Sequence, residues 1–524
     1  MGDTLKLILA PNAWPHKLSD LPDPSQLHQF PLHVRPLNRL TWDEADAAIL
    51  PIWREDFALA KSAITSPWDF IVETTLDHTP REATHITESD LERLLEHGIV
   101  EEMPDSEVCF GDCRVFSVLE QEKKRRRLII EPMINDILFF TGNVQLPSLD
   151  EILRPGSMNG AACYDFTAFY NQFELPLRAR SWYCFSFFGR IYRLRVIATG
   201  QRQCPAMAHM LTTSVALTAA KGTDATPTTF IDNVRFAGSP TSTEAATRNF
   251  LTACERIGIT VSKEPCNAHQ QQYTFLGIEF NHFTKQATIS EKTRRKMADR
   301  VLQITTGISA SWSMRCFLAT LSLIIWGMRV VDIPLAKAYH LIKFARRRSI
   351  QHLDSLANVW PSIIPSMLEL LGMCSNNHRD LRIPRRSDLV LFSDASLHGW
   401  GTVFINGHRV NVHAGRFAHL EHINILEARA VCFAIQFVDP QPRPTMIRIL
   451  IDNTTVLAGI RGGGGWGGVA SHNHCLAMLS LHFAELCKER NLIPTVEYVR
   501  SADNLADLPS RLMKAFHASF VMPQ

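Results

Sequence analysis

The sequence predicts a multidomain protein of mixed α/β and α+β class, and three observations lead to this prediction. The chain has 524 residues, which is more than a single hydrophobic core accommodates. Short β-favouring runs alternate with helix-like segments from about residue 86 to 285, and again from about 387 to 515. Between them, apolar residues recur at three and four spacing, which is typical of helices. We therefore expect two mixed domains separated by a helical region.

The first mixed domain is expected to begin with a helix over 89–98, capped by Ser89 and ended by Gly98. Residues 1–85 are rich in Pro, Leu and Trp without periodicity, and they predict no role. A polar, basic stretch over 376–387 is the best predicted linker of the chain. We expect an N-terminal extension over 1–85, a first mixed domain over 86–285 and a helical region with linker over 286–386. A second mixed domain over 387–515 and a tail over 516–524 follow.

Composition indicates an ordinary globular protein, with 46% hydrophobic and 20% charged residues. The net charge of +2 excludes a uniformly basic protein, so contact with nucleic acid depends on local patches. Two basic runs, 123–127 and 346–348, are candidates, although such runs equally fit a solvated surface.

The cysteine pattern and the N-terminus indicate an intracellular protein. Twelve cysteines are scattered, and the one close pair, Cys109 and Cys113, lacks the second pair of a structural zinc site. No signal-peptide architecture opens the chain, and no apolar run approaches the roughly 20 residues that span a bilayer. We expect a cytoplasmic or nuclear protein with free thiols, neither secreted nor bound to membrane.

An acidic turn is the most informative local feature of the N-terminal half. In the segment 230–234, Asp232 and Asn233 lie between two β-favouring runs, which predicts a hairpin with a carboxylate at its tip. Asp165 ends another apolar run, 161–164, and precedes several aromatic residues. Two carboxylates at neighbouring strand ends form a site that can hold two Mg²⁺ ions.

Four acidic residues form a second pattern in the C-terminal half. Asp394 and Asp452 each end an apolar strand, Glu427 lies in the first turns of a helix, and Asp507 lies near the start of the last helix. Singly, each fits a helix cap or a surface charge. Packed together, four carboxylates repel one another, and divalent cations make the arrangement tolerable.

The N-terminal motifs resemble those of reverse transcriptases over about residues 88–282. The resemblance rests on five segments in the family's order, namely 165–173, 200–206, 230–233, 258–263 and 275–277. It implies metal ligation by Asp165 and Asp232, and charge neutralisation or proton donation at the departing pyrophosphate by Lys263. It also implies the contacts with nucleotide and primer made by Phe166, Tyr170, Gly200, Asn233, Leu276 and Gly277. Arg126 or Arg127 would hold the triphosphate, with Lys124 as a lesser candidate, and spacing does not choose among them.

Asn233 departs from the family's pair of aspartates. A neutral amide removes one negative charge beside two divalent cations. We expect weaker metal binding, with Mn²⁺ as an alternative to Mg²⁺, and loss of polymerase activity stays open as an alternative.

The C-terminal order of strand Asp, helix Glu, strand Asp and helix Asp resembles ribonuclease H. This implies that Asp394, Glu427, Asp452 and Asp507 ligate metal and catalyse cleavage. The phrases 422–427 and 504–511 look most like retrotransposons of the DIRS or VIPER type, which carry a tyrosine recombinase. The mobile histidine that some members carry is missing from 499–503, and Arg500, His472 and His474 are the open substitutes. A glycine-rich run at 462–468 fits either a substrate-facing loop or an inert surface loop.

Together the resemblances imply right-hand polymerase fingers and palm, a helical thumb and connection, and a C-terminal ribonuclease H-like domain. The implied activities are RNA-directed DNA polymerase and hybrid-specific endoribonuclease, with two Mg²⁺ ions per site. The implied partners are RNA template, DNA primer, RNA/DNA hybrid and deoxynucleoside triphosphates. The alternatives are a catalytically impaired or domesticated nucleic-acid-binding protein, and an active ribonuclease H with a dead polymerase.

Overall fold

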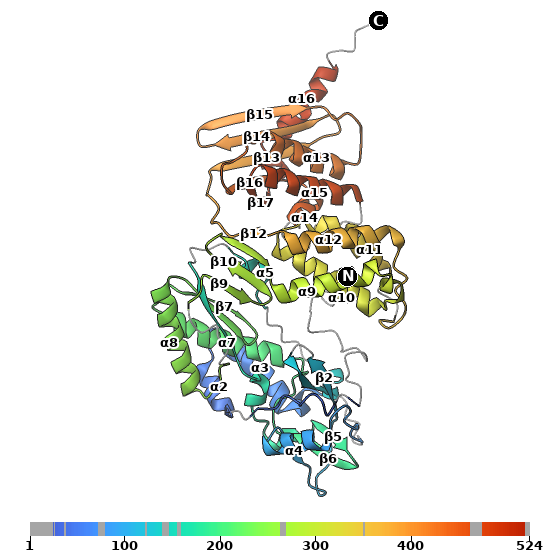
Figure 1. Ribbon diagram of the computed structural model, residues 1–524. Helices are drawn as coiled ribbons and strands as arrows, with labels where there is room; N and C mark the ends of the chain where they lie inside the picture. The colour runs from blue at the N-terminus through green and yellow to red at the C-terminus, as the bar shows by residue number, and fades with distance from the viewer. Residues whose placement is uncertain are drawn as a thin grey trace. The chain divides into compact units, whose positions relative to one another are not determined.

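The computed structural model describes residues 25, 27–35, 38–71, 79–120, 123–138, 146–154, 159–262, 269–348, 352–461 and 474–518. They fall into two compact units (Figure 1). The N-terminal unit lies within Pro15–Ser148 and Met158–Leu276, and the C-terminal unit lies within Leu149–Ser157 and Gly277–Gln524. Helices and several separate sheets confirm the mixed α/β prediction.

A three-stranded antiparallel sheet lies at the heart of the N-terminal unit. Its order is β4-β8-β7, with β4 at Ala161–Asp165, β7 at Thr226–Phe230 and β8 at Asn233–Ala237. The predicted hairpin is confirmed, because Phe230 pairs with Asn233 across a two-residue turn. Two helices, α7 at Cys204–Ala220 and α8 at Pro240–Arg256, pack on these strands, and each begins with a proline in its first turn.

The described part of 1–85 belongs to this same core. Helices α2 at Trp42–Ala48 and α3 at Arg54–Thr65 contact α7, and Leu40, Phe57 and Ile64 are buried with the core residues of the sheet. Arg39 ties the segment to the next helix through bonds to the carbonyls of His97 and Gly98 at 2.8 and 3.0 Å. The stretch without sequence periodicity therefore completes the core of the unit.

That next helix, α4, spans Glu88–Glu96 and begins one residue earlier than Ser89. Its cap is Thr87, whose side chain accepts from the Asp90 amide while the Asp90 carboxylate accepts from the Thr87 amide. The prediction of Ser89 as cap was wrong, because this reciprocal pair forms two residues earlier in the chain. Gly98 follows the helix with a positive φ of 64°, as its residue type predicted.

Two further sheets and the short helix α6 at Leu177–Arg180 complete the N-terminal unit. The short helix α5 at Leu149–Ile152 belongs to the C-terminal unit. Strands β2 at Cys113–Glu120 and β3 at Arg125–Pro132 form an antiparallel hairpin. Strands β1 at Val100–Glu102, β5 at Cys184–Phe187 and β6 at Arg190–Leu194 form a sheet in the order β1-β6-β5.

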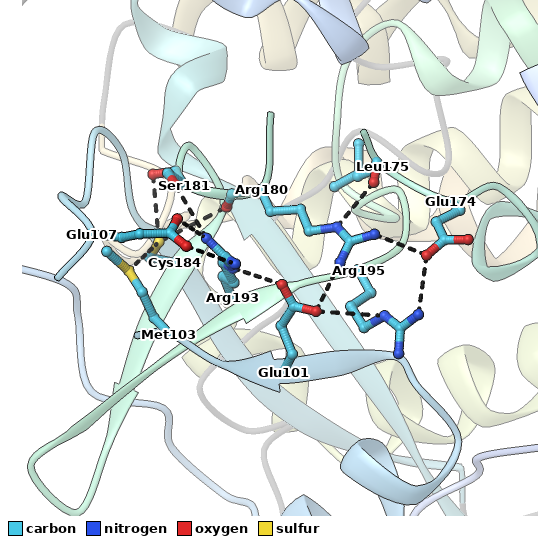
Figure 2. A network of polar contacts seen from close by, with 10 residues as sticks. All are labelled: Glu101, Met103, Glu107, Glu174, Leu175, Arg180, Ser181, Cys184, Arg193 and Arg195. Carbon is cyan, nitrogen blue, oxygen red and sulfur yellow. Dashed lines mark hydrogen bonds and ion pairs between the residues drawn. The ribbon is translucent and has the colours of Figure 1, made fainter. Parts of the chain in front are cut away.

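An ion-pair network covers the β1-β6-β5 sheet (Figure 2). Glu101 lies opposite Arg193 across the strands and accepts from it at 2.7 Å, and it also pairs with Arg180 at 2.7 Å. The Arg193 side chain is only 4% exposed. A buried guanidinium that loses its carboxylate costs more than the pair itself contributes.

We therefore expect Glu101→Ala to lower the free energy of unfolding by about 3 kcal/mol, because the buried Arg193 guanidinium loses one of its carboxylate partners. The matched control is Glu102→Ala on the same strand, which breaks an exposed pair with Arg190 at 3.4 Å and should cost less than about 1 kcal/mol. Urea unfolding of both variants checks this. Equal losses would contradict the assignment of Glu101 as the centre of the network.

The helical region of the C-terminal unit is confirmed over 291–376. It contains α9 at Glu291–Thr305, α10 at Met314–Val330, α11 at Tyr339–Arg348 and α12 at Ile364–Asn376. Gly327 permits the close approach of three of these helices, because a Cβ there would lie 2.7 Å from the Met297 side chain and 3.0 Å from Cys374 Sγ. Before the helices, strand β9 at Gln272–Phe275 ends the N-terminal unit, and β10 at Ile278–Asn281 and β11 at Gln286–Ile289 begin the sheet of this unit.

The predicted linker over 376–387 contacts its neighbours at two points. Strand β12 at Arg379–Asp380 pairs with β11, Arg379 donates to the Arg329 carbonyl at 2.9 Å, and Arg385 bridges to Thr445 of the last domain. Most of the segment is exposed or half-buried, and these hydrogen bonds hold it at Arg379 and Arg385.

The last domain is a five-stranded sheet in the order β15-β14-β13-β16-β17. The strands are β13 at Leu389–Ala395, β14 at Trp400–Asn406, β15 at Arg409–Gly415, β16 at Thr445–Ile451 and β17 at Leu492–Tyr498. The first three pair antiparallel, whereas β13, β16 and β17 pair parallel. Its helices are α13 at Ile423–Gln436, α14 at Thr454–Arg461, α15 at His474–Glu489 and α16 at Asp507–Ala518.

No helix within the described ranges combines the length and the apolar character that crossing a bilayer requires.

Candidate functional site

Three carboxylates meet at one end of the C-terminal sheet. Phe392 of β13 pairs with Leu450 of β16, and the two strands run parallel. Asp394 and Asp452 each follow this pair by two residues, so they emerge from neighbouring strands at the same level. Glu427 reaches them from α13, which packs on β13. Ligand oxygens of the three residues all lie within 4.8 Å of one another. We call this group the carboxylate triad.

The triad is electrostatically costly without a cation. Asp394 and Glu427 are 4% and 6% exposed. Burial, with added repulsion from neighbouring carboxylates, raises the pKa of Asp394 to about 6 and the pKa of Glu427 to about 9. Asp452 Oδ1 is buried and accepts no hydrogen bond within the described part of the chain. Converging oxygens, mutual repulsion and an unsatisfied acceptor fit a divalent cation.

Cation affinity at the triad should rise with pH, because bound protons must leave the carboxyls first. Both folded pKa values lie above the ordinary 3.8 and 4.5, so the metal-free fold retains protons that the unfolded chain has released. This contribution destabilises the metal-free fold progressively as pH rises from about 4 to 9. We expect the gain in melting temperature with Mg²⁺ or Mn²⁺ to grow between pH 6 and 9, measured by thermal unfolding. An equal gain at both pH values would contradict it.

Asp507, the fourth predicted ligand, lies outside the triad's ligand group. It begins α16, and its carboxylate pairs with Arg511 one turn later at 2.6 Å. Its charge still contributes to the raised pKa values of Asp394 and Glu427, so it lies near them. The predicted quartet is thus a triad with a neighbouring carboxylate that an arginine compensates.

Sequence reasoning missed three polar residues around the triad. Ser510 Oγ donates to Asp394 Oδ2, and Asn453 donates to Asn424 Oδ1 at 3.0 Å. Asn453 follows Asp452 directly, and Asn424 precedes Glu427 by one helical turn, so their bond joins the two ligand-bearing segments. Their positions in the sequence could have indicated them, because Asn453 is next to Asp452, Asn424 is three residues before Glu427, and Ser510 is three residues after Asp507.

The two predicted acids of the N-terminal unit are adjacent in the sheet. Asp165 of β4 pairs with Asn233 of β8, and the Phe166 amide donates to the Asp232 carbonyl at 3.3 Å. Asp165 is exposed, and Asp232 is half-buried in the turn. The strand end and the hairpin tip therefore share one edge of the sheet.

Asn233 acts on Asp232 directly, because its amide donates to Asp232 Oδ1 at 3.0 Å. Burial raises the pKa of Asp232, while backbone and Asn233 hydrogen bonds and the charge of Arg127 oppose the increase. The Asn233 amide therefore occupies one oxygen of Asp232. An aspartate at position 233 has no such donor, so that oxygen would stay accessible to a cation.

Among the basic candidates of β3 and its turn, Arg127 faces the acidic edge. Its side chain is exposed, and its charge acts on both Asp232 and Tyr170, which is half-buried. Arg126 points the other way: it is 1% exposed and holds both Asp90 oxygens at 2.9 and 2.7 Å. Alternation along a strand separates the two neighbours, so Arg126 is not available to a triphosphate. Lys124 is exposed in the turn before β3.

Phe166 and Gly200 also differ from their expected roles. The Phe166 ring is 2% exposed and packs 4.7 Å from Phe169 between ring centroids, so its side chain belongs to the core. A Cβ at Gly200 would lie 2.5 Å from the Ile130 carbonyl oxygen, so the close approach is to β3 rather than to a nucleotide. Pro205 starts α7 as predicted.

The other predicted positions are partly outside the described residues. Lys263, His472 and the glycine-rich run 462–468 lie outside them. Leu276 and Gly277 take positive φ values of 52° and 79° at the turn between β9 and β10. His474 packs 5.3 Å from the rings of Tyr339 and His340, and Arg500 is exposed before the last helix.

No protein-family model matches this chain, and no curated protein matches it. Similar solved structures include three of a foamy viral protease-reverse transcriptase. One, designated dRH and in complex with double-stranded DNA, has 12% identity, a TM-score of 0.48 and coverage of 91% of this chain and 85% of that chain. A second, with double-stranded DNA, has 12% identity, a TM-score of 0.49 and coverage of 86% and 98%. The third, with RNA/DNA hybrid, has 14% identity, a TM-score of 0.49 and coverage of 88% and 64%. One fold hosts many activities, so a likeness of fold does not determine what this chain does.

Proposed function

We propose that this chain is an RNA-directed DNA polymerase with ribonuclease H activity, encoded by a retrotransposon of the DIRS or VIPER type. The observation that carries the proposal is the carboxylate triad of Asp394, Glu427 and Asp452 at the ends of two parallel strands and a helix. The acidic sheet edge with Asp165 and Asp232 supplies a separate candidate site for polymerisation.

In the nuclease half, the triad's oxygens would hold Mg²⁺ or Mn²⁺ opposite a phosphate of the RNA strand in an RNA/DNA hybrid. The bound cations would activate water and stabilise the leaving 3′ oxygen. Asp394 and Asp452 have backbones fixed by β13 and β16, and Glu427 is fixed by the packing of α13. Such fixed positions keep the carboxylates together despite their repulsion.

In the polymerase half, Asp165 and Asp232 would hold the cations, and Arg127 would meet the triphosphate of a deoxynucleotide. A guanidinium suits this contact because it can offer two parallel donors to phosphate oxygens. Tyr170, half-buried beside the same edge, would lie under the sugar of the incoming nucleotide. An RNA template and a DNA primer complete the substrates.

A second candidate is an active ribonuclease H joined to an impaired polymerase. The bond from Asn233 to Asp232 favours it, because it occupies an oxygen and supplies no charge. A nucleic-acid-binding protein without either activity is the third possibility.

Two assays on the full chain separate these functions. Labelled RNA/DNA hybrid and a primed RNA template are each incubated with Mg²⁺ and with Mn²⁺. Cleavage together with extension supports the proposal, and cleavage alone supports the second candidate. Absence of both activities under each metal condition would leave only nucleic-acid binding.

A further inference from the structure

The last helix reaches the triad through a serine. Ser510, one turn into α16, is fully buried, and its hydroxyl donates to Asp394 Oδ2 at 2.5 Å. The same oxygen lies 2.8 Å from the Asp507 carbonyl of its own helix. The hydroxyl carries one proton, so Asp394 and the helix carbonyl are its two alternative acceptors.

The backbone around Ser510 is built for this contact. Gly401 of β14 pairs with Asp394, and a Cβ at Gly401 would lie 2.4 Å from the Ser510 amide nitrogen. Only glycine lets α16 approach the sheet so closely. From the other side, Ser396 Oγ donates to the Ser510 carbonyl at 2.8 Å.

The acidic residue of the same helix is engaged elsewhere, because Asp507 pairs with Arg511. Among the α16 side chains that the structure describes, Ser510 therefore makes the hydrogen bond to the triad. It holds one oxygen of Asp394, which restricts how that carboxylate can rotate relative to Glu427 and Asp452.

We propose that Ser510 is a positioning residue for the cation site: its hydroxyl orients Asp394 so that the triad can bind a divalent cation. The inference rests on the metal site of the proposed function and adds a residue to it. Hydrogen-bonding partners of metal ligands commonly change metal affinity by 10 to 100-fold when they are removed.

The test compares Ser510→Ala with Ser480→Ala in the full-length protein. Ser480 is a half-buried serine of α15 whose hydroxyl donates to a carbonyl of its own helix, Leu476, at 2.9 Å. Mn²⁺ binding is titrated by electron paramagnetic resonance, and the triad's binding is identified as the part that Asp452→Asn abolishes. We expect Ser510→Ala to weaken that binding at least about 10-fold, and Ser480→Ala to leave it within about twofold.

A second measurement distinguishes positioning from a loss of structure. If Ser510 positions a ligand, the melting temperature of metal-free Ser510→Ala stays close to that of the wild type, and excess Mn²⁺ restores hybrid cleavage. Unchanged Mn²⁺ affinity would overturn the inference. So would weakened binding accompanied by a collapse of the metal-free melting temperature. A wild-type protein that binds Mn²⁺ at the triad without cleaving hybrid would refute the nuclease proposal instead, while the Ser510 result would stand on binding.

Discussion

Asp452→Asn is expected to abolish cleavage of RNA in an RNA/DNA hybrid, with a loss of about 10³-fold or more. The change keeps the size of the side chain and removes one negative charge from three converging carboxylates. It also replaces one carboxylate oxygen by an amide nitrogen, which does not ligate a hard cation. The measurement is the initial rate of hybrid hydrolysis at saturating Mg²⁺ and Mn²⁺.

The same substitution should raise the melting temperature of the metal-free protein, because it relieves repulsion within the triad. Asp439→Asn, at an exposed position of the same domain, is the matched control and should change neither property. Retained cleavage in Asp452→Asn would show that the triad is not the nuclease centre. Primer extension should be unaffected, since Asp452 belongs to the other unit from Asp165 and Asp232.

Asp232→Asn is expected to abolish primer extension, again by about 10³-fold, while hybrid cleavage persists. The substitution leaves an amide pair at the hairpin tip, with Asp165 as the remaining acid across the strands. The reverse change, Asn233→Asp, should raise Mg²⁺-supported extension about tenfold, because it supplies a charge beside the cations and releases the Asp232 oxygen that Asn233 now holds. Single-nucleotide incorporation on a primed RNA template measures both variants.

Asp224→Asn, an exposed position in the same unit, is the control for the loss. Extension that survives in Asp232→Asn would remove this edge from consideration as the polymerase centre. If Asn233→Asp leaves the Mg²⁺ and Mn²⁺ rates unchanged, the amide is not what limits the site, and the impaired-polymerase candidate loses its support.

Local sequence patterns were enough to predict a structural feature wherever a single short segment determines it. The hairpin at Asp232 follows from β-favouring runs on both sides of a polar pair, and the start of α7 follows from Pro205. The positions of Asp394 and Asp452 at strand ends follow from the apolar runs that precede them. These features depend on residues within a few places of one another, so they can be predicted without the rest of the chain.

Local sequence patterns did not predict the position of a side chain or segment where a residue far away in the sequence determines it. Arg126 and Arg127 are adjacent and chemically equal, and Asp90, 36 residues away, draws Arg126 into the core. Within the segment 376–387, composition does not reveal that β12 pairs with β11 or that Arg379 donates to the Arg329 carbonyl. The described part of 1–85 forms α2 and α3, and their buried side chains complete a core that segments far away in the sequence build.

By itself, the sequence determined which residue types could meet: acidic residues after apolar runs, a carboxylate at a hairpin tip, and a helical region between two mixed domains. Only the tertiary structure decided that three of the four C-terminal acids converge, and that α16 contacts Asp394 through Ser510 while Arg511 holds Asp507. The physical reason is that secondary structure depends on near neighbours, whereas strand register, helix approach at Gly401 and the choice of ionic partner depend on segments far apart in the chain.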